Sequence, residues 1–534
     1  MRGYRRLQKE YSNKNGKQQD VLPEKKEEPG NPEEEGNAVK KEKTLLSGNL
    51  KEDGDRIKSL FKGATDFTYR RIKITNSTHA MILYLDGLVD IEKIELHVIH
   101  PLLHIDFAKA NNTELSIEYI FDKLSSANLN QDNRLQSTID QILAGNTVLL
   151  IDGIDKAIII SEQKWEQRSV KEPLSEAVVI GPREGFTENI ETNISMVRRR
   201  LKTTKLKFES MQIGKMSNTM VVITYLENIA QKSIIEEVRN RLNQIDIDSI
   251  EDSGYIVEFI EDNPYSVFPQ VLQTERPDRV VGNLLEGRVG IIVENSPFVL
   301  IVPVTFFQMM NSPEDYYGRF IMSSFIRFIR YLFLFVALLF PSIYIAVTTF
   351  HQELLPTNLL FSVAASRDKV PFPAVVEVLL MEITFEALRE AGLRLPRPIG
   401  STVSIVGALV IGQAAVEAGI VSAPLVIVVS TTGIASFMFP NYPLTGAIRL
   451  LRFIMIFLAG TLGFYGILLG VFFILGHLVQ LRSFGVPYLA PMAPFNFNNM
   501  KDIFVRVPWW KMDERPEQTG KRNIKRVGIR QRKY

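Results

Sequence analysis

The chain contains no cysteine, which excludes disulfide bonds, thiol catalysis and thiolate metal sites but does not fix the cellular compartment. Net charge is almost absent as well: 62 basic residues nearly balance 60 acidic ones, which argues against nucleic-acid binding by the whole protein. The N-terminus is basic and then acidic, without the apolar segment of a secretory signal peptide. We therefore expect the N-terminal part to stay on the cytoplasmic side.

The motifs of common active sites are also missing. No G-x-S-x-G nucleophile elbow occurs, so serine-hydrolase chemistry has no support. Residues 181–185 (GPREG) share only their glycines with a phosphate-binding loop, because the Gly-Lys-Ser/Thr ending is absent and Pro182 has no amide N–H. We expect a protein that is not an enzyme and that carries no cofactor.

Three histidines have a spacing that could suggest metal ligands: His97, His100 and His104. Pro101 is expected to interrupt the helix that would align them. No carboxylate is clearly placed to complete a ligand set. We therefore expect no metal site here.

What is present changes along the chain. Residues 1–58 are rich in Lys, Glu, Asn, Pro and Gly and nearly lack aromatic residues. Such a segment buries too little apolar surface to offset its ordering entropy, so we predict a disordered charged head. Residues 59–210 and 211–318 predict two soluble α/β subdomains, because short Val/Ile/Leu runs alternate with helical patterns. The predicted strands are Met81–Leu85, Val148–Ile151, Ala157–Ile160, Ala177–Ile180, Met220–Tyr225, Val289–Val293 and Phe298–Val302, and the predicted helices are Leu135–Leu143, Ile190–Lys202 and Ser233–Gln244.

Residues 319–480 predict an all-α, multi-span membrane domain, followed by a basic cytoplasmic tail over 481–534. Four crossings place both ends of the chain in the cytoplasm, and residues 374–392 then form an extra amphipathic or re-entrant helix. The alternative is that 374–392 also spans, which moves Arg389, Arg394 and Arg397 inside but the basic tail outside. The four predicted spans are about 331–350, 402–420, 421–439 and 453–478.

The apolar half holds four carboxylates: Glu377, Glu382, Glu386 and Glu417. Ionisable groups at membrane depth are costly and usually face a bundle interior or a water-filled path. A ring of such acids from several subunits would favour cations in a pore. The alternatives are an interfacial helix with a solvated polar face and, for Glu417, a lateral bond to Gln413 four residues earlier.

Four stretches in their expected order resemble the GerA-type spore germination receptor family, A subunit. The resemblance covers about residues 60–500. The stretches are AVVIGPREGFTENIETNISMVRRRLKT (177–203), DRVVGNLLEGRVGIIVENSPFVLIVP (278–303), SRDKVPFPAVVEVLLMEITFEALREAGLRLP (366–396) and IGSTVSIVGALVIGQAAVEAGIVSAPLVIVVSTTGIASF (399–437).

The resemblance implies a subunit of a nutrient receptor in the spore inner membrane. Such A subunits are expected to work with a permease-like B subunit, which senses the nutrient, and with a lipoprotein C subunit. They are expected to self-associate, plausibly as a pentamer, into the part that releases monovalent cations. A soluble region of two α/β subdomains is also implied.

Residues of this chain match two blocks of the family pattern. The amphipathic block contributes pore-region candidates, namely Pro371, Pro373, Glu377, Glu382 and Glu386. The soluble signature is expected to serve structure or assembly through a strand-to-helix turn, and its residues are Gly181, Pro182, Arg183, Gly185, Phe186 and Asn189.

Three functions follow as hypotheses. The first is a nutrient-gated cation channel subunit of the receptor. The second is a non-conducting scaffold and signalling subunit of the same receptor. The third is a membrane enzyme or a solute transporter. The lack of a catalytic constellation argues against the enzyme, and the sequence offers no convincing inverted repeat of broken spans for a transporter.

Overall fold

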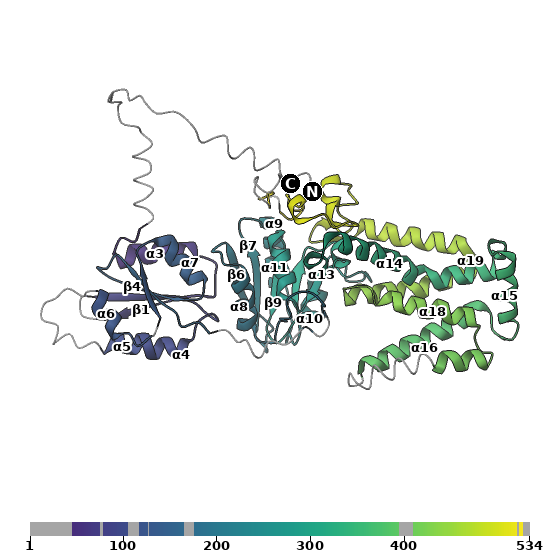
Figure 1. Cartoon of the computed structure of the whole chain (residues 1–534), viewed down its shortest axis with the longest axis horizontal. Coiled ribbons are helices and arrows are strands. Elements are labelled where there is room, and N and C mark those ends of the chain that lie inside the picture. Colours follow the sequence, from purple (N-terminus) through teal and green to yellow (C-terminus); the bar gives the residue numbers. More distant parts are fainter. Residues whose placement is uncertain are drawn as a thin grey trace, which may run out of the picture. The chain divides into compact units, whose positions relative to one another are not determined.

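The computed structural model describes residues 45–74, 78–104, 117–126, 128–164, 173, 176–394, 410–520 and 523–526 (Figure 1). Most of the predicted disordered head lies outside the described residues. Its last part is helical, because Asn49 caps α3 (Leu50–Leu60) by accepting hydrogen bonds from the amides of Lys51 and Glu52. Ile57 of this helix is fully buried in an apolar cluster. The predicted boundary at residue 58 therefore lies too late in the chain.

The first subdomain is built on a five-stranded antiparallel sheet in the order β1-β2-β4-β5-β3. Three of the four strands predicted between residues 59 and 210 are confirmed as β2, β4 and β5. The edge strands β1 and β3 were not predicted, because mostly polar and partly exposed residues form them. The strands are β1 (Phe67–Lys73), β2 (His79–Leu85), β3 (Leu129–Asp132), β4 (Thr147–Ile151) and β5 (Ala157–Ile160), and the helices after α3 are α4 (Ile91–Ile94), a π-turn (Glu95–Ile99), α5 (His100–Leu103), α6 (Ile117–Lys123) and α7 (Leu135–Leu143).

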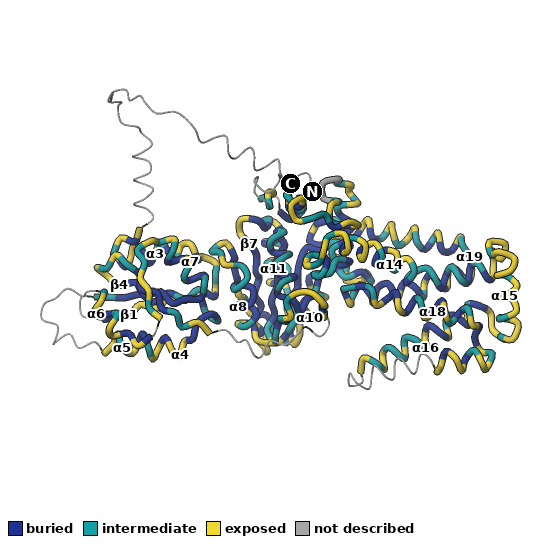
Figure 2. The backbone as a smooth tube through the Cα atoms, in the orientation of Figure 1, coloured by how far each residue is buried: buried dark blue, intermediate teal, exposed yellow. Residues whose placement is uncertain are grey.

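The second subdomain repeats this topology. The predicted boundary at residue 210 falls inside its first strand, β6 (Leu206–Ile213), so that boundary lies too late in the chain. Its antiparallel sheet has the order β6-β7-β9-β10-β8, and both subdomains run β-β-α-α-β-α-β-β after a leading helix if the segment 91–103 is taken as one helix. The buried residues follow the strands of both sheets (Figure 2). The strands predicted at 220–225, 289–293 and 298–302 of the second subdomain are confirmed. The elements are α8 (Ile190–Arg200), β6 (Leu206–Ile213), β7 (Thr219–Leu226), α9 (Lys232–Asn243), α10 (Ser253–Ile260), β8 (Leu272–Thr274), α11 (Pro277–Leu285), β9 (Val289–Val293) and β10 (Val299–Val302).

Two of the described helices are long and apolar enough to cross a membrane, α14 (Phe320–Thr349) and α19 (Tyr442–Gln480). Helix α18 (Ala423–Ser436) is apolar but has only 14 residues, and a span needs about 20. The predicted span 402–420 lies partly outside the described residues. The four-crossing arrangement is therefore not confirmed. The other helices of this region are α12 (Phe306–Met309), α13 (Glu314–Tyr317), a 3₁₀ turn (Gln352–Leu354), α15 (Thr357–Arg367) and α16 (Ala374–Arg394).

Helix α19 is a hairpin of two helical arms that reverses at Gly463. This glycine has φ 60° and ψ −139°, a backbone conformation that is not helical. A Cβ at Gly466 would collide with the carbonyl of Leu458, and one at Gly470 would collide with the sulfur of Met455. Eight residues of a straight helix span about 12 Å, so these contacts require the chain to fold back. The predicted single span 453–478 is wrong, because hydropathy does not register a turn made by an apolar sequence.

The chain after α19 packs on the second subdomain. The Nε2 atom of His477 lies 2.8 Å from Ser266 Oγ. Ser483 Oγ donates to the carbonyl of Gln270 at 2.7 Å and accepts from the amide of Val304 at 3.0 Å. The soluble region and the C-terminal segment therefore meet at the same end of the α19 hairpin. The segment contains β11 (Arg482–Ser483), β12 (Val486–Pro487) and two 3₁₀ turns (Phe497–Asp502 and Trp509–Lys511).

Candidate functional site

The acids of α16 are held by groups from other segments of the chain. Pro373 stands just before the helix, and its carbonyl accepts from the Glu377 amide at 3.1 Å. The Glu377 carboxylate is fully buried. It accepts from Arg367 Nε at 3.3 Å and from the backbone amide of Ser422 at 3.1 Å. Glu377 thus joins the start of α16 to α15 and to the turn before α18.

The next two acids pair with arginines of α19. Arg452 Nη1 donates to Glu382 Oε2 at 2.6 Å, and both side chains are almost completely buried. Arg449 Nη1 donates to Glu386 Oε2 at 2.5 Å, with each side chain about a fifth to a quarter exposed. We call these two pairs the charge ladder. It fixes the register of α16 against the first arm of α19 (residues 442–462).

The spacing of the ladder follows from antiparallel packing. The two acids are four residues apart on α16, and the two arginines are three residues apart on α19, so each set occupies one helical face. Further along, the side chain of Val375 fills the space beside Gly460. Burying ions in an apolar bundle is costly unless each is paired, and the ladder provides that pairing.

The structure does not place these acids on a solvated helix face, as the interfacial alternative expected, since Glu377 and Glu382 are buried. The pore-lining role remains a prediction. Glu417 lies apart from the ladder, in the helical stretch 410–417. Its carboxylate accepts from Gln413 Nε2 at 2.9 Å, which confirms the predicted lateral bond.

The soluble signature is a loop rather than a strand-to-helix turn. The predicted strand 177–180 is wrong: the amides of Val179 and Ile180 donate to the Glu314 side chain, and both apolar side chains are exposed. At Gly181, φ is +139°, and an added Cβ would lie 2.9 Å from the ring of Tyr317. Glu314, on the short helix α13, therefore accepts the backbone hydrogen bonds that a neighbouring strand would otherwise accept.

The rest of the signature anchors this loop to the second subdomain. Arg276 Nη2 donates to the carbonyl of Pro182 at 3.0 Å. Phe186 is buried in the core, and its amide donates to the carbonyl of Glu275 at 2.7 Å. Asn189 caps α8 by accepting from the Thr192 amide at 2.9 Å. Two members of the signature, Arg183 and Gly185, lie in the same irregular stretch.

A buried charge network joins the soluble region to the base of α14. Asp315 of α13 accepts from Arg327 Nε at 2.9 Å and from Arg330 Nη1 at 3.0 Å. Arg327 Nη1 also donates to Asp502 Oδ1 at 2.7 Å, and the hydroxyl of Tyr316 donates to Asp502 Oδ2 at 2.6 Å. Burial raises the pKa of Tyr316 well above its ordinary value, so its phenol stays protonated and can donate. The network therefore joins the consecutive helices α13 and α14 to a segment that lies more than 170 residues further along the chain.

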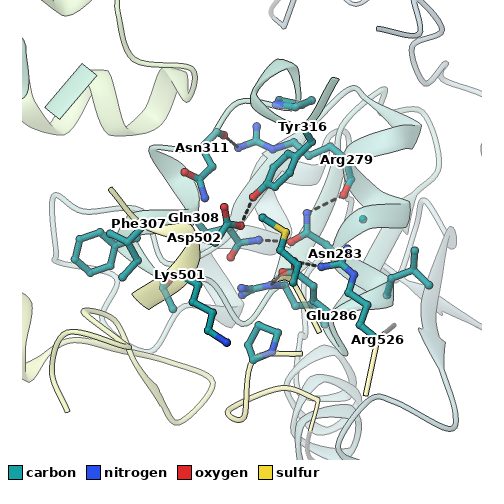
Figure 3. A pocket seen from close by; sticks show the side chains of 18 of the residues that line it. Arg279, Asn283, Glu286, Phe307, Gln308, Asn311, Tyr316, Lys501, Asp502 and Arg526 are labelled. Atoms are coloured by element: carbon teal, nitrogen blue, oxygen red, sulfur yellow. Dashed lines mark hydrogen bonds and ion pairs between the residues drawn. The ribbon is translucent and has the colours of Figure 1, made fainter. Parts of the chain in front are cut away.

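A cavity of about 450 Å³ opens beside this network. Its walls come from α11, the α12–α13 segment and the C-terminal segment, with Tyr316 pointing toward Asp502 (Figure 3). The amide orientation of one lining residue is fixed by its neighbours. Asn283 donates to the Arg279 carbonyl at 2.7 Å, so its oxygen faces the amide nitrogen of Gln308. The Gln308 oxygen is then left without a hydrogen-bond partner.

The histidines do not converge. His97 Nδ1 lies 3.2 Å from Glu162, whereas His104 Nδ1 lies 2.9 Å from the carbonyl of His100. Pro101 does not interrupt the helix as expected, because Ile99 and His100 before it keep right-handed helical backbone angles and the helix continues to Leu103. Within the described ranges, no group of three His, Cys, Asp or Glu residues is arranged to hold a metal ion.

The arginine partners of Glu382 and Glu386 were not predicted from the sequence. Arg449 and Arg452 precede the predicted span 453–478, and no role was predicted for them. Their i, i+3 spacing next to an apolar run was the available signal, because it matches the i, i+4 spacing of Glu382 and Glu386 on an opposing helix. Asp315 had no comparable signal.

A sequence profile of the family described as Bacillus/Clostridium GerA spore germination protein matches residues 55–518. Among curated proteins, the chain is 48% identical over 472 residues to the uncharacterized membrane protein YfkQ of Bacillus subtilis (strain 168), covering 88% of this chain and 91% of YfkQ. It is 46% identical over 496 residues to spore germination protein KA of the same organism, covering 92% of this chain and 91% of that protein.

The chain is 42% identical over 464 residues to spore germination protein A1 of Bacillus subtilis (strain 168), covering 87% of this chain and 92% of that protein. Among solved structures, it matches the N-terminal domain of the A subunit of the Bacillus megaterium spore germinant receptor GerK3. That match has 34% sequence identity and a TM-score of 0.40, and it covers 49% of this chain and 98% of the other.

Proposed function

Since this chain belongs to the Bacillus/Clostridium GerA family of spore germination proteins, we propose that it is the A subunit of a nutrient germinant receptor in the spore inner membrane. The curated relatives named as spore germination proteins support the germination role. In this proposal it acts with a permease-like B subunit and a lipoprotein C subunit. It self-associates, as a pentamer, into a path for monovalent cations.

The charge ladder is the observation that carries the channel proposal. Glu382 and Glu386 lie in an otherwise apolar bundle, and each is neutralised by an arginine of α19. We propose that these pairs hold the closed form and that opening separates α16 from the first arm of α19. The freed carboxylates would then favour cations over anions along the path.

The network around Asp315 supports a route from the soluble region to the bundle. Asp315 pairs with Arg327 and Arg330, which lie in the second and third turns of α14. A movement of the soluble region would therefore act directly on a spanning helix. A nutrient-bound partner can shift the equilibrium between the closed and open forms only if it binds the open form more tightly than the closed form. Moving from 1% to 99% open requires a ~10⁴-fold preference, or about 5.5 kcal/mol.

The test is ion flux in vesicles that contain this chain with its B and C partners. Nutrient should release monovalent cations from vesicles with the parent chain. E382Q and E386Q should each change the flux or its ion preference, because each leaves an arginine of the ladder unpaired. E390Q is the matched control: Glu390 is on the same helix and pairs only with exposed Arg394. If E382Q and E386Q conduct and select like E390Q, the ladder is not part of the path.

The second candidate function is a non-conducting scaffold and signalling subunit. One observation favours it: each ladder acid is already paired within its own chain, as in a structural clamp. Complexes that are assembled and bind nutrient, yet release no cations under any nutrient, would support this function over the channel.

A further inference from the structure

The charge ladder has more cations than anions. Besides Arg449 and Arg452, the guanidinium of Arg389 interacts electrostatically with both arginines and with Glu386. It lies 5.0 Å from the ring of Phe437, over its face. Three arginines therefore share two carboxylates, and the cluster has a net charge of +1 between α16 and α19.

The cluster also has hydrogen-bond donors to spare. Four guanidinium nitrogens are buried and have no hydrogen-bond partner among the residues that the structure describes: Arg389 Nη1, Arg449 Nε, Arg452 Nε and Arg452 Nη2. The Arg452 side chain is only 2% exposed, so bulk water does not satisfy it. One acceptor, Glu382 Oε1, is also unpaired, but a single oxygen cannot serve four donors. Leaving such buried donors without acceptors costs free energy. A bound anion would accept hydrogen bonds from these donors and would also balance the excess positive charge.

The location of the cluster indicates which anion it meets. The α19 hairpin turns at Gly463, beside Phe350 and His351, whereas His477 near its other end contacts the soluble region. Arg449 lies about 10 Å from the start of α19, nearer the end that meets the soluble region, and Arg452 lies about 15 Å from it, near the middle of the first arm. From the position of Arg449, a long arginine side chain can extend toward the polar headgroups of a bilayer.

We propose that Arg389, Arg449 and Arg452 form a binding site for the phosphate group of an acidic phospholipid. Guanidinium forks match phosphate oxygens in geometry and charge. Basic pockets between membrane helices on the cytoplasmic side bind lipid headgroups in this way. Arg389 and Arg449 are partly exposed, whereas Arg452 is buried. The bound lipid stabilises the contact of α16 with α19, which goes beyond the proposed channel activity.

The test compares the full-length chain in nanodiscs of phosphatidylcholine alone with nanodiscs that also contain phosphatidylglycerol. Phosphatidylglycerol should raise the thermal midpoint, and native mass spectrometry should show retained phosphatidylglycerol. R389Q should weaken retention about tenfold, since one charge-assisted hydrogen-bonding group is lost without breaking either ladder pair. R389K should retain part of the binding. R394Q is the matched control, because Arg394 is 79% exposed and pairs with Glu390.

Three results would overturn the proposal. The parent chain could show the same midpoint and lipid retention in both compositions, a comparison that needs no variant to fold. R389Q could retain phosphatidylglycerol as well as R394Q does. Inorganic phosphate added to phosphatidylcholine nanodiscs could reproduce the full stabilisation, which would identify a soluble anion rather than a lipid as the ligand. None of these measurements involves ion flux, so their failure is distinct from failure of the channel proposal.

Discussion

The substitution D315N should destabilise the junction between the soluble region and α14. The Asp315 side chain is only 3% exposed and accepts from Arg327 at 2.9 Å and from Arg330 at 3.0 and 3.2 Å. Asparagine keeps the shape but removes the charge and turns one acceptor into a donor. Removing one partner of a buried pair costs about 3–5 kcal/mol. Because Arg327 keeps Asp502, we expect the lower end, ~3 kcal/mol.

Denaturant titration of the full-length chain in detergent measures this cost as a lower unfolding midpoint. Tryptophan fluorescence suits the readout, because Trp509 lies 5.8 Å from the ring of Tyr316 within the junction. D246N is the matched control, since Asp246 forms only an exposed pair with Lys215 and should cost no more than about 1 kcal/mol.

The reasoning is refuted if D315N and D246N unfold at the same denaturant concentration. A double-mutant cycle with R330M adds a second check. Asp315 and Arg330 should show a coupling energy of about 1–3 kcal/mol, because they share one network. A coupling near zero would mean that the network does not stabilise the junction.

Two further predictions concern backbone positions. G463A should impair folding of the membrane region, measured as loss of monodisperse protein in detergent, because φ is 60° and the new methyl group would meet Phe350 at 3.1 Å, whereas G476A adds its methyl group to open space and should behave like the parent. N189A should lower the free energy of unfolding by about 1 kcal/mol through loss of the α8 cap, whereas N189D should preserve it; equal stability of the two variants would contradict the capping role.

The soluble region was largely predictable because its signals are local. Runs such as 147–151 and 289–293 are fully buried strands made of aliphatic residues, and their hydropathy is visible in any window. The helix 190–200 carried its Asn cap and its terminal charges in the sequence. The strand predicted at 177–180 failed because Glu314, more than 130 residues away, takes its amides.

The membrane region was less predictable because its signals are not local. Hydropathy predicted a single span over 453–478, but the reversal at Gly463 depends on one backbone conformation and on the packing of both arms. The acids Glu377, Glu382 and Glu386 were singled out from residue type and position. Whether they face water, lipid or an arginine depends on which helix lies opposite, and that information is not carried by their own segment.

By itself, the sequence determined the two-part organisation, the buried strands, the family and the set of functional candidates. These depend on composition and short-range order, which a linear chain displays directly. Only the tertiary structure decided that the two subdomains share one topology, that Arg449 and Arg452 neutralise the acids of α16, and that Asp502 pairs with Arg327 of α14. Pairing of this kind is decided by the packing of distant segments, because a buried charge is stable only beside the partner that the fold brings to it.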